Sequence, residues 1–341
     1  MSELSLSVVI PCRNEARYLP GLLDALAAQT HPPDEIVIVD GNSTDGTPAV
    51  AQAWAAAHPG LALQVVANPR QHIPHALNLG IAAARGQLIA RLDGHARPAP
   101  DYLARCRAAL SETGAALVGG AWDVQPGAAG VIAQAIALAV SSRLGAGDAR
   151  YRLAGAATGA VDTVPFGCFP RLLWQTLGGY DETLLTNEDY EFAARVRAGG
   201  GVVWFDAAIR CAYFARPAFG ALAAQYWRYG WWKAQMLKRH PRSLRGRQAA
   251  PALWTAVGLG GWLLAGWWPP LGWGLGGLWL IYLGLVVGQA VDLARGRPAA
   301  LRLTLALVAA YGLIHFGWGL GVWAGAVGGP APWSRPASGI R

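Results

Sequence analysis

The sequence predicts an α/β fold with a mostly parallel sheet, followed by C-terminal transmembrane helices. Three observations lead to this prediction. The first 125 residues alternate strand-like and helix-like segments, the second part of the chain is basic and rich in tryptophan, and three long apolar stretches lie near the C-terminus. Strands separated by helices of this length form right-handed βαβ units, whose parallel sheet is covered on both faces.

The strand-like segments of the first part are short apolar runs with many β-branched residues, as in strands buried on both faces. We expect strands over residues 5–11, 35–39, 61–67, 86–92 and 115–122. Helical spacing of apolar residues predicts helices over 14–29, 47–58, 72–84 and 101–112. Because ligands bind at the carboxyl ends of such strands, the polar loops that follow the first, second and fourth strands are expected to converge.

The pattern of residues 125–215 is mixed. We expect a mostly alanine helix over 130–144, a Gly-rich loop over 145–160, a strand over 161–166, helices over 170–177 and 187–198, and strands near 202–205 and 209–214. Residues 1–215 are therefore expected to form one domain.

The C-terminal part reads as a membrane module. Residues 219–247 form a Trp-rich helix that passes into a basic run, which is typical of an interfacial anchor and alternatively of a solvated helix face. The stretches 252–268, 271–291 and 301–327 are each long and apolar enough to span a bilayer, although the first could be one arm of a re-entrant hairpin. We expect an interfacial helix over 216–250, about three transmembrane helices over 251–330 and a tail over 331–341.

The charge distribution supports this division. The net charge is +8, but residues 1–205 hold 14 basic and 18 acidic side chains, whereas residues 206–341 hold 14 basic and only 2 acidic ones. An acidic first part disfavours a nucleic-acid partner. The positive-inside rule places the N-terminal domain and the 292–302 loop in the cytoplasm. Residues 1–11 lack the basic and long apolar regions of a signal peptide.

Two candidate ligand sites follow predicted strands. Asp40 ends the second strand and can accept hydrogen bonds from a base or ribose, although an ordinary Asx-turn would give the same pattern. Asp93 and His95 flank Gly94 after the fourth strand, so both side chains can point at one ion. This oxygen and nitrogen pair would suit Mn²⁺ or Mg²⁺. The alternative is a simple turn at the end of the strand.

A third candidate site is the pair Glu188 and Asp189, which begins a predicted helix. Acidic residues there can simply favour the helix dipole. One of the two could equally be a general base, with its pKa raised by the neighbouring carboxylate. His72, His75 and His315 are expected to be packing or surface residues rather than ligands.

Several of these segments together resemble the inverting family 2 glycosyltransferases. The motifs SVVIPCRNE, EIVIVDGNSTDGT, ARLDGHA, GGYDE and NEDYE occur in the order and spacing of that family, and QYWRY resembles its Gln-x-x-Arg-Trp motif. The resemblance covers about residues 5–245. It is strongest to the bacterial exopolysaccharide glucosyltransferases of the succinoglycan type, and it implies a GT-A fold, a Rossmann-like arrangement with a mostly parallel sheet.

The resemblance also implies roles for individual residues. Asp40 and the turn that contains Pro11, Arg13 and Glu15 would hold the nucleotide, and Asp93 and His95 would hold the metal on the diphosphate. Asp189 would be the base that deprotonates the acceptor, with Glu188 beside it. Gln225 and Arg228 of the QYWRY motif would lie near the diphosphate or the acceptor.

This chain departs from the family pattern at two positions. Gly41 replaces the second Asp of the usual Asp-Asp-Gly-Ser sequence, and His95 replaces the second Asp of the metal motif. The second change leaves the choice between Mn²⁺ and Mg²⁺ open.

The expected function is transfer of a sugar from a nucleotide donor to a lipid-linked acceptor, a polyprenyl diphosphate saccharide, at the bacterial inner membrane. UDP-glucose as the donor is implied by the resemblance alone. Two alternatives stay open at this point. One is a polyprenyl-phosphate sugar synthase, whose phosphate acceptor needs no strong base, and the other is a non-catalytic membrane scaffold that keeps a nucleotide-sugar-binding fold.

Overall fold

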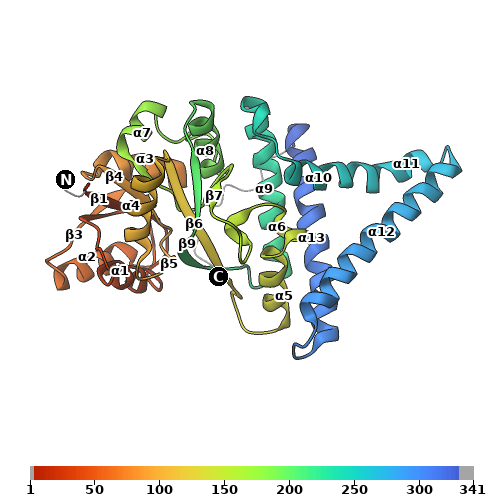
Figure 1. Cartoon of the computed structure of the whole chain (residues 1–341), viewed down its shortest axis with the longest axis horizontal. Coiled ribbons are helices and arrows are strands. Elements are labelled where there is room, and N and C mark those ends of the chain that lie inside the picture. The colour runs from red at the N-terminus through yellow and green to blue at the C-terminus, as the bar shows by residue number, and fades with distance from the viewer. Residues whose placement is uncertain (1–3, 330–341) are drawn as a thin grey trace. The chain divides into compact units, whose positions relative to one another are not determined.

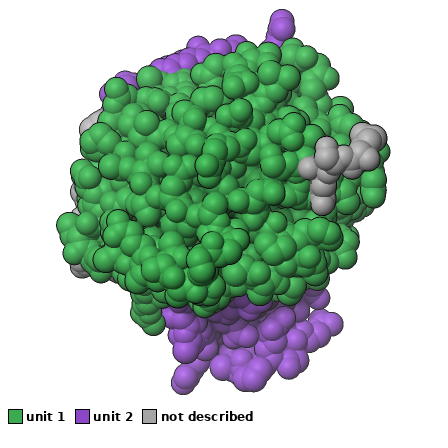
Figure 2. Space-filling view, turned by 90° about the vertical axis from the view of Figure 1, so that its left-hand side faces the viewer, with its two compact units in different colours: residues 1–123, 155–213, 334–341 green, residues 124–154, 214–333 purple. Residues whose placement is uncertain are grey.

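A computed structural model describes residues 4–329 of the chain (Figure 1). The described residues cluster into two compact units, coloured separately in Figure 2. Unit 1 contains the residues up to Asp123 and Gly155–Tyr213, and unit 2 contains Val124–Ala154 and the residues from Phe214 onward. The domain division at residue 215 stays a prediction, and the clustering adds that Val124–Ala154 belongs with the C-terminal helices.

One sheet forms the centre of the α/β part and confirms the predicted fold class. In the described residues it has nine strands in the order β3-β2-β1-β4-β8-β6-β9-β5, with β7 paired to β9. The strands are β1 (Leu6–Cys12), β2 (Glu35–Asp40), β3 (Ala62–Ala67), β4 (Leu88–Arg91), β5 (Arg97–Pro98), β6 (Leu117–Gln125), β7 (Gly159–Ala160), β8 (Cys168–Pro170) and β9 (Val203–Phe214). The first four strands in the chain pair in parallel, whereas β8 pairs with β4 and β6 in antiparallel fashion.

Helices follow the strands of unit 1 as the sequence pattern predicts. They are α1 (Leu19–Ala27), α2 (Thr47–Ala57), α3 (Ile73–Ala83), α4 (Tyr102–Thr113), α7 (Arg171–Leu177) and α8 (Glu188–Ala198). The Leu, Val and Ile residues of β1 and β2 are fully buried, for example Val8, Ile10, Ile36 and Ile38 at 0% exposure. Burial on both faces explains why these strands are continuous apolar runs.

The register of the parallel strands brings three polar loops to one edge of the sheet. Cys12 at the end of β1 lies opposite Asp40 at the end of β2, and Val9 lies opposite Arg91 at the end of β4. The residues that follow these strands therefore emerge on the same side, as the spacing of the motifs predicts.

Three local predictions for unit 1 were wrong. Helix α1 begins at Leu19 instead of residue 14, since residues 13–16 form a loop that bonds to the loop after β2. Residues 161–166 form no strand and connect β7 to β8. The two strands expected near 202–205 and 209–214 are the single strand β9, and the very short strand β5 was not expected.

Unit 2 is helical. It contains α5 (Val131–Val140), α6 (Arg143–Ala146), α9 (Phe219–Arg239), α10 (Gly246–Thr255), the π-helical turn Ala256–Gly260, α11 (Gly261–Ala265), α12 (Pro269–Ala294) and α13 (Ala300–Ala326). The basic helix thus ends at Arg239 rather than at residue 247. A proline follows at position 241, and the residue before a proline avoids the helical region.

Two helices of the described range are long and apolar enough to cross a membrane, α12 with 26 residues and α13 with 27. The first predicted span, 252–268, is divided among α10, the π-helical turn and α11, each of which is short. Three spans therefore stay a prediction, and the re-entrant alternative remains open for the first.

Glycines allow α9 and α13 to pack backbone to backbone. A Cβ atom on Gly230 of α9 would lie 2.2 Å from the carbonyl oxygen of Trp318, and one on Gly321 of α13 would lie 2.3 Å from that of Trp227. We call these contacts the glycine seam. Small residues permit such close helix packing where the hydrophobic effect is weak.

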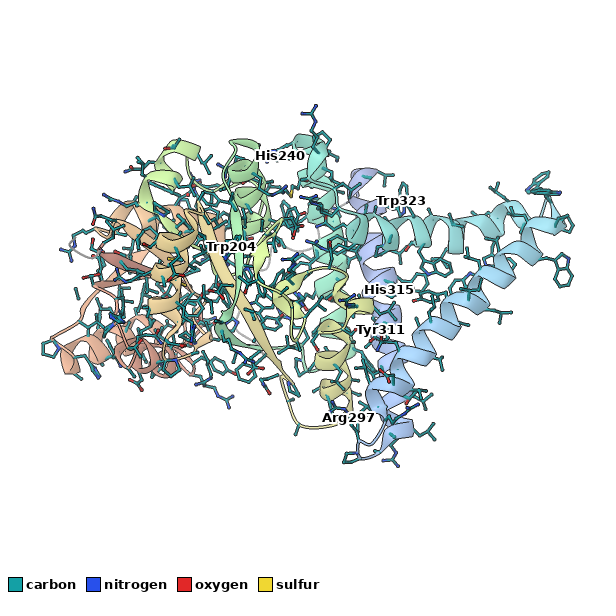
Figure 3. The ribbon with its side chains drawn as sticks, viewed as in Figure 1. Trp204, His240, Arg297, Tyr311, His315 and Trp323 are labelled. Carbon is teal, nitrogen blue, oxygen red and sulfur yellow. The ribbon has the colours of Figure 1, made fainter. Side chains whose placement is uncertain are left out.

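Polar side chains connect α13 to α5, α6 and α12 within the same unit. Tyr311 and His315 both project from α13 (Figure 3). The Tyr311 hydroxyl lies 2.8 Å from the Ser142 hydroxyl. The His315 ring lies 2.9 Å from the Tyr282 hydroxyl through Nδ1 and 2.9 Å from the Leu144 carbonyl oxygen through Nε2. These contacts support the expectation that His315 is a packing residue.

Candidate active site

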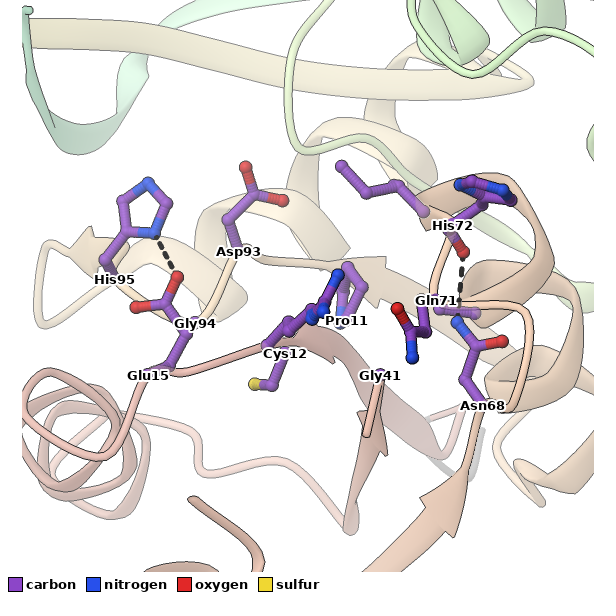
Figure 4. Close-up of a pocket in the computed structure, with 13 residues that line it drawn as sticks. Pro11, Cys12, Glu15, Gly41, Asn68, Gln71, His72, Asp93, Gly94 and His95 are labelled. Carbon is purple, nitrogen blue, oxygen red and sulfur yellow. Dashed lines mark hydrogen bonds and ion pairs between the residues drawn. The ribbon is translucent and has the colours of Figure 1, made fainter. Parts of the chain in front are cut away.

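A cleft opens at the carboxyl ends of β1 and β4 in unit 1 (Figure 4). It is lined by Pro11, Cys12, Arg13, Glu15, Gly41, Asn68, Gln71, His72, Ile73, Ala76, Asp93, Gly94 and His95. Five of the residues predicted for nucleotide or metal binding are in this set: Pro11, Arg13, Glu15, Asp93 and His95. Asp40 ends β2 directly before Gly41 and is buried at 8% exposure.

Hydrogen bonds between two loops hold the floor of the cleft. The Glu15 amide donates to the Thr47 hydroxyl at 2.8 Å, and the Ala16 amide donates to an Asp45 carboxylate oxygen at 3.0 Å. The Asn14 amide donates to the Ser43 hydroxyl at 2.9 Å. The polar residues of the VDGNSTDGT motif therefore fix the turn that presents Arg13 and Glu15.

Three polar groups in and beside the cleft are buried without a hydrogen-bond partner among the described residues. They are Nε and Nη1 of Arg13, Oε2 of Glu15 and Oδ1 of Asp40. Leaving such atoms unsatisfied costs about 1–3 kcal/mol each, so a cluster of them in one place needs an explanation. A bound ligand with donors and acceptors of its own would satisfy all three groups.

The chemistry of the donor set fits a divalent cation that is shared with a ligand. Nδ1 of His95 lies 3.0 Å from Oε1 of Glu15, so a carboxylate orients the ring in the way common for metal-binding histidines. No group of three or more His, Cys, Asp or Glu side chains suited to a metal occurs in the described part of the chain. A cation held by Asp93 and His95 would therefore take its other ligands from the diphosphate and water.

A buried arginine connects the metal motif to the predicted base. Arg91 ends β4, and its side chain is 5% exposed. Its Nη2 donates to Asp93 at 3.1 Å, and its Nη1 donates to Glu188 at 2.9 Å and also to Asp189. The structure thus brings together the carboxylates of two motifs that are nearly one hundred residues apart in sequence, next to one guanidinium group.

The surroundings of Asp189 raise the pKa of its carboxyl group. Its desolvation by burial raises the pKa most strongly, Arg91 lowers it, and the carboxylates of Glu188 and Asp93 raise it, with a net shift to about 7. The side chain keeps 26% exposure, so a substrate can reach it. A carboxylate whose pKa lies near neutrality can accept a proton efficiently at neutral pH.

Sequence reasoning missed several residues of this site. Arg91 was read as part of a buried strand, and Asn68, Gln71 and His72 were not expected in the cleft. His72 lines the cleft, and the Asn68 amide donates to its carbonyl oxygen at 3.1 Å. Desolvation lowers the pKa of His72, as do the nearby His75 and Arg13. The position of this loop directly after β3 was the signal that could have indicated it.

Gln225 and Arg228 lie on α9, in unit 2. Gln225 is buried at 5% exposure, and its amide donates to the Tyr229 hydroxyl at 2.9 Å. The guanidinium of Arg228 lies 6.0 Å from the centre of the Tyr229 ring. Their part in the site stays a prediction.

Comparisons with known proteins give the family context. Residues 7–162 match the sequence family described as Glycosyl transferase family 2. The chain is 29% identical to the succinoglycan biosynthesis protein ExoA of Rhizobium meliloti (strain 1021) over 334 residues, which cover 95% of each chain.

Two further similarities extend this context. An enzyme of Methanococcus voltae is 26% identical over 244 residues, which cover 69% of this chain and 74% of that one. It is named dolichyl N-acetyl-alpha-D-glucosaminyl phosphate 3-beta-D-2,3-diacetamido-2,3-dideoxy-beta-D-glucuronosyltransferase. The mannosyltransferase PcManGT of Pyrobaculum calidifontis, solved in complex with GDP-Man and Mn²⁺, superposes with a TM-score of 0.56 at 26% identity, covering 72% of this chain and 66% of that one.

The sheet order, the cleft at the strand ends and these similarities agree with the resemblance seen in the sequence motifs. They also agree with a GT-A type of fold. Residues 7–162 match a glycosyl transferase family 2 domain, and by that match and its relatives the protein is a glycosyltransferase.

Proposed function

We propose that this protein is a membrane-anchored, inverting glycosyltransferase that transfers glucose from UDP-glucose to a lipid-linked saccharide in exopolysaccharide or cell-surface polysaccharide synthesis. The observation that carries the proposal is the arrangement around Arg91, in which the predicted metal carboxylate Asp93 and the predicted base Asp189 bind the same guanidinium group. This shared contact supports a single site in which a donor-binding motif would lie beside an acceptor-activating one.

The donor nucleotide would occupy the cleft next to Arg13, Glu15 and Asp40. The unpartnered atoms of these residues comprise both donors and acceptors, which suits a base and ribose that present both kinds of group. UDP-glucose is the donor that the resemblance of the sequence motifs to the succinoglycan-type glucosyltransferases implies, and the similarity to a succinoglycan biosynthesis protein over 95% of the chain agrees with that resemblance.

Asp93 and His95 would hold a divalent cation at the diphosphate. When bound, such a cation stabilises the negative charge that develops on the leaving nucleoside diphosphate. Glu15 would keep the His95 ring oriented through Nδ1, so that the cation is bound through Nε2. The related mannosyltransferase solved with GDP-Man and Mn²⁺ supports this assignment.

Asp189 would accept the proton of the attacking hydroxyl group. The acceptor oxygen forms its bond to the anomeric carbon while the bond to the diphosphate breaks, and the hydroxyl proton passes to the Asp189 carboxylate. A single displacement needs one base and no protein nucleophile, so the configuration at the anomeric carbon inverts. The adjacent Glu188 would remain bound to Arg91.

The second unit would anchor the enzyme at the inner face of the cell membrane, with the catalytic domain in the cytoplasm. Helices α12 and α13 are long and apolar enough to span the bilayer. The basic residues from Lys238 to Arg247 would contact anionic head groups, at about 1 kcal/mol for each residue near the surface. A lipid-linked acceptor, such as a polyprenyl diphosphate saccharide, would reach the site from this membrane.

The test is a transfer assay in purified membranes with a panel of radiolabelled nucleotide sugars and a lipid extract as acceptor. We expect transfer from UDP-glucose and an inverted glycosidic bond in the product. Asp189→Asn removes the base and should lower the turnover number by about 10³-fold. Asp101→Asn is the matched control, because the Asp101 side chain is 40% exposed and pairs only with Arg105 among the ion pairs of the described residues.

Three results would contradict the proposal. Asp189→Asn with a turnover near that of the wild type would exclude Asp189 as the base. Full activity after chelation by EDTA would exclude Asp93 and His95 as metal ligands. An acid-labile phosphodiester in the product would favour the polyprenyl-phosphate sugar synthase instead.

A further inference from the structure

We propose that Arg91 is a positioning residue that holds the base Asp189 in fixed register with the donor-side carboxylate Asp93. This inference rests on the proposed function, because it concerns the same reaction. It assigns a role to Arg91, which lies within the ARLDGHA motif but has no role among those that the sequence resemblance implies.

The guanidinium group of Arg91 contacts carboxylates from two different elements. Nη1 bonds to Glu188 and to Asp189, both at the start of α8, whereas Nη2 bonds to Asp93, which follows β4. The two branches of one planar group thus contact the two halves of the reaction centre. A rigid fork of this kind fixes both the distance and the direction between its partners.

The backbone is fixed both at Arg91 and at the start of α8. Arg91 ends a strand that pairs in parallel with β1 on one side and antiparallel with β8 on the other, so its backbone cannot shift easily. Helix α8 begins at Glu188 after Asn187, which has a φ of 70°. A left-handed residue directly before the helix sets the direction in which Glu188 and Asp189 leave the loop.

Stability alone explains poorly why Arg91 and its three carboxylate partners are clustered. Three carboxylates share one cation here, and the side chain of Arg91 is 5% exposed while that of Glu188 is 10% exposed. Buried ion clusters often contribute less to stability than apolar residues of similar volume would. A role in placing the reacting groups accounts for a buried arginine in an otherwise apolar strand.

The test compares Arg91→Lys with Arg85→Lys as the matched control. A lysine keeps the positive charge, but its single ammonium group cannot reproduce a fork that donates through two branches. Arg85 also pairs with a buried carboxylate, that of Glu35. The Arg85 side chain is 78% exposed, however, and Glu35 does not line the cleft. Both variants are measured for transfer to the lipid acceptor, for donor hydrolysis without acceptor, for UDP binding with Mn²⁺ and for thermal unfolding.

We expect Arg91→Lys to lower the turnover number for transfer by about 10²-fold, the typical cost of misplacing a reacting group by about 1 Å. The dissociation constant for UDP should change by less than about threefold, because a lysine keeps the positive charge beside Asp93. Among the described residues, the Arg91 side chain donates to Asp93, Glu188 and Asp189 and to none of the groups expected to hold the nucleotide. The ratio of donor hydrolysis to transfer should rise. Arg85→Lys should match the wild type in all four measurements.

Two results would overturn the inference. One is a turnover number for Arg91→Lys close to that of the wild type. The other is a loss of UDP binding in proportion to the loss of transfer, together with a lower unfolding temperature, which would mean that Arg91 serves the fold of the whole unit. A wild-type enzyme that transfers no sugar would instead contradict the proposed function, so the two failures are distinguishable.

Discussion

Asp189 illustrates how one carboxyl group can be both buried and available. Desolvation and the negative charges of Glu188 and Asp93 disfavour its ionised form, whereas Arg91 favours it. These opposing influences bring its pKa to about 7, and the remaining 26% exposure leaves a path to solvent and substrate. An exposed aspartate without such neighbours would be a much weaker base at the same pH.

The raised pKa of Asp189 predicts a pH dependence of transfer. The base must be ionised to accept a proton, so the turnover number should rise with pH through about 7 and should fall about tenfold for each unit below about 6. The measurement is a pH profile of turnover with saturating donor and acceptor. Asp189→Glu should keep such a limb at a shifted position, and a profile that is flat between about pH 5 and 8 would contradict the assignment.

At the scale of residues, the position of the polar side chains at the strand ends could be predicted from the sequence. The role of Arg91, which bonds to carboxylates of two motifs, could not. Asp40, Asp93 and the Arg13 turn were placed correctly at one edge because parallel strands bring their carboxyl ends together. Arg91 could not be assigned in this way. Its partners Glu188 and Asp189 lie about a hundred residues away, and only the folded chain places α8 beside β4.

The packing of α9 against α13 in unit 2 depends on glycines, which have no side chain. At the glycine seam, a Cβ atom on Gly321 would lie 2.3 Å from the carbonyl oxygen of Trp227 and 3.1 Å from the amide nitrogen of Trp231. Backbone atoms cannot turn away as a flexible side chain can. On the same helix, a Cβ atom on Gly312 would meet nothing within 4 Å in the described residues.

This contrast predicts that Gly321→Ala destabilises the pairing of α9 with α13, whereas Gly312→Ala does not. Overpacking of this kind costs about 1–3 kcal/mol, and Ala in the open helix position is neutral or favourable. The measurement is thermal unfolding of each variant in the same detergent. Equal unfolding temperatures for the two variants would show that the seam does not hold the helices together.

At the scale of elements, the types of the long periodic segments were predictable and their ends were not. Helix α9 ends at Arg239, eight residues before the predicted end, although the charge pattern continues through the proline that stops it. The expected strand over 161–166 has an apolar and β-branched composition, yet it connects β7 to β8 without pairing. Composition reports what a segment can form, whereas the available pairing edges decide what it does form.

At the scale of the whole molecule, most of the large apolar side chains that are exposed in the described residues lie between Leu253 and Val327, in the part expected to form the membrane module. Trp267, Trp268 and Trp273 are 90%, 61% and 85% exposed around the start of α12, and its other end is followed by Arg295 and Arg297. Tryptophan is enriched at membrane interfaces, and arginine on the cytoplasmic side. This polarity agrees with a helix that crosses the bilayer from outside to inside.

Cysteine labelling tests this orientation. We expect a Cys introduced by Gly266→Cys to react in intact cells with a maleimide that cannot cross membranes, and one introduced by Pro298→Cys to react only after lysis. The native cysteines give little background, because Cys12, Cys106, Cys168 and Cys211 are all buried. Labelling of both positions only after lysis would contradict a transmembrane α12.

The glycine seam also bears on how α9 would be attached to a membrane. A basic amphipathic helix held only by head-group charge would behave as a peripheral element, because concentrated salt screens the attraction and releases it. Helix α9 is instead packed backbone to backbone against α13, a helix long enough to span the bilayer. We therefore expect that its attachment to a membrane would not depend on ionic strength. The polypeptide that leads into α9 from β9 would remain tethered at the bilayer surface in salt washes that strip adsorbed proteins.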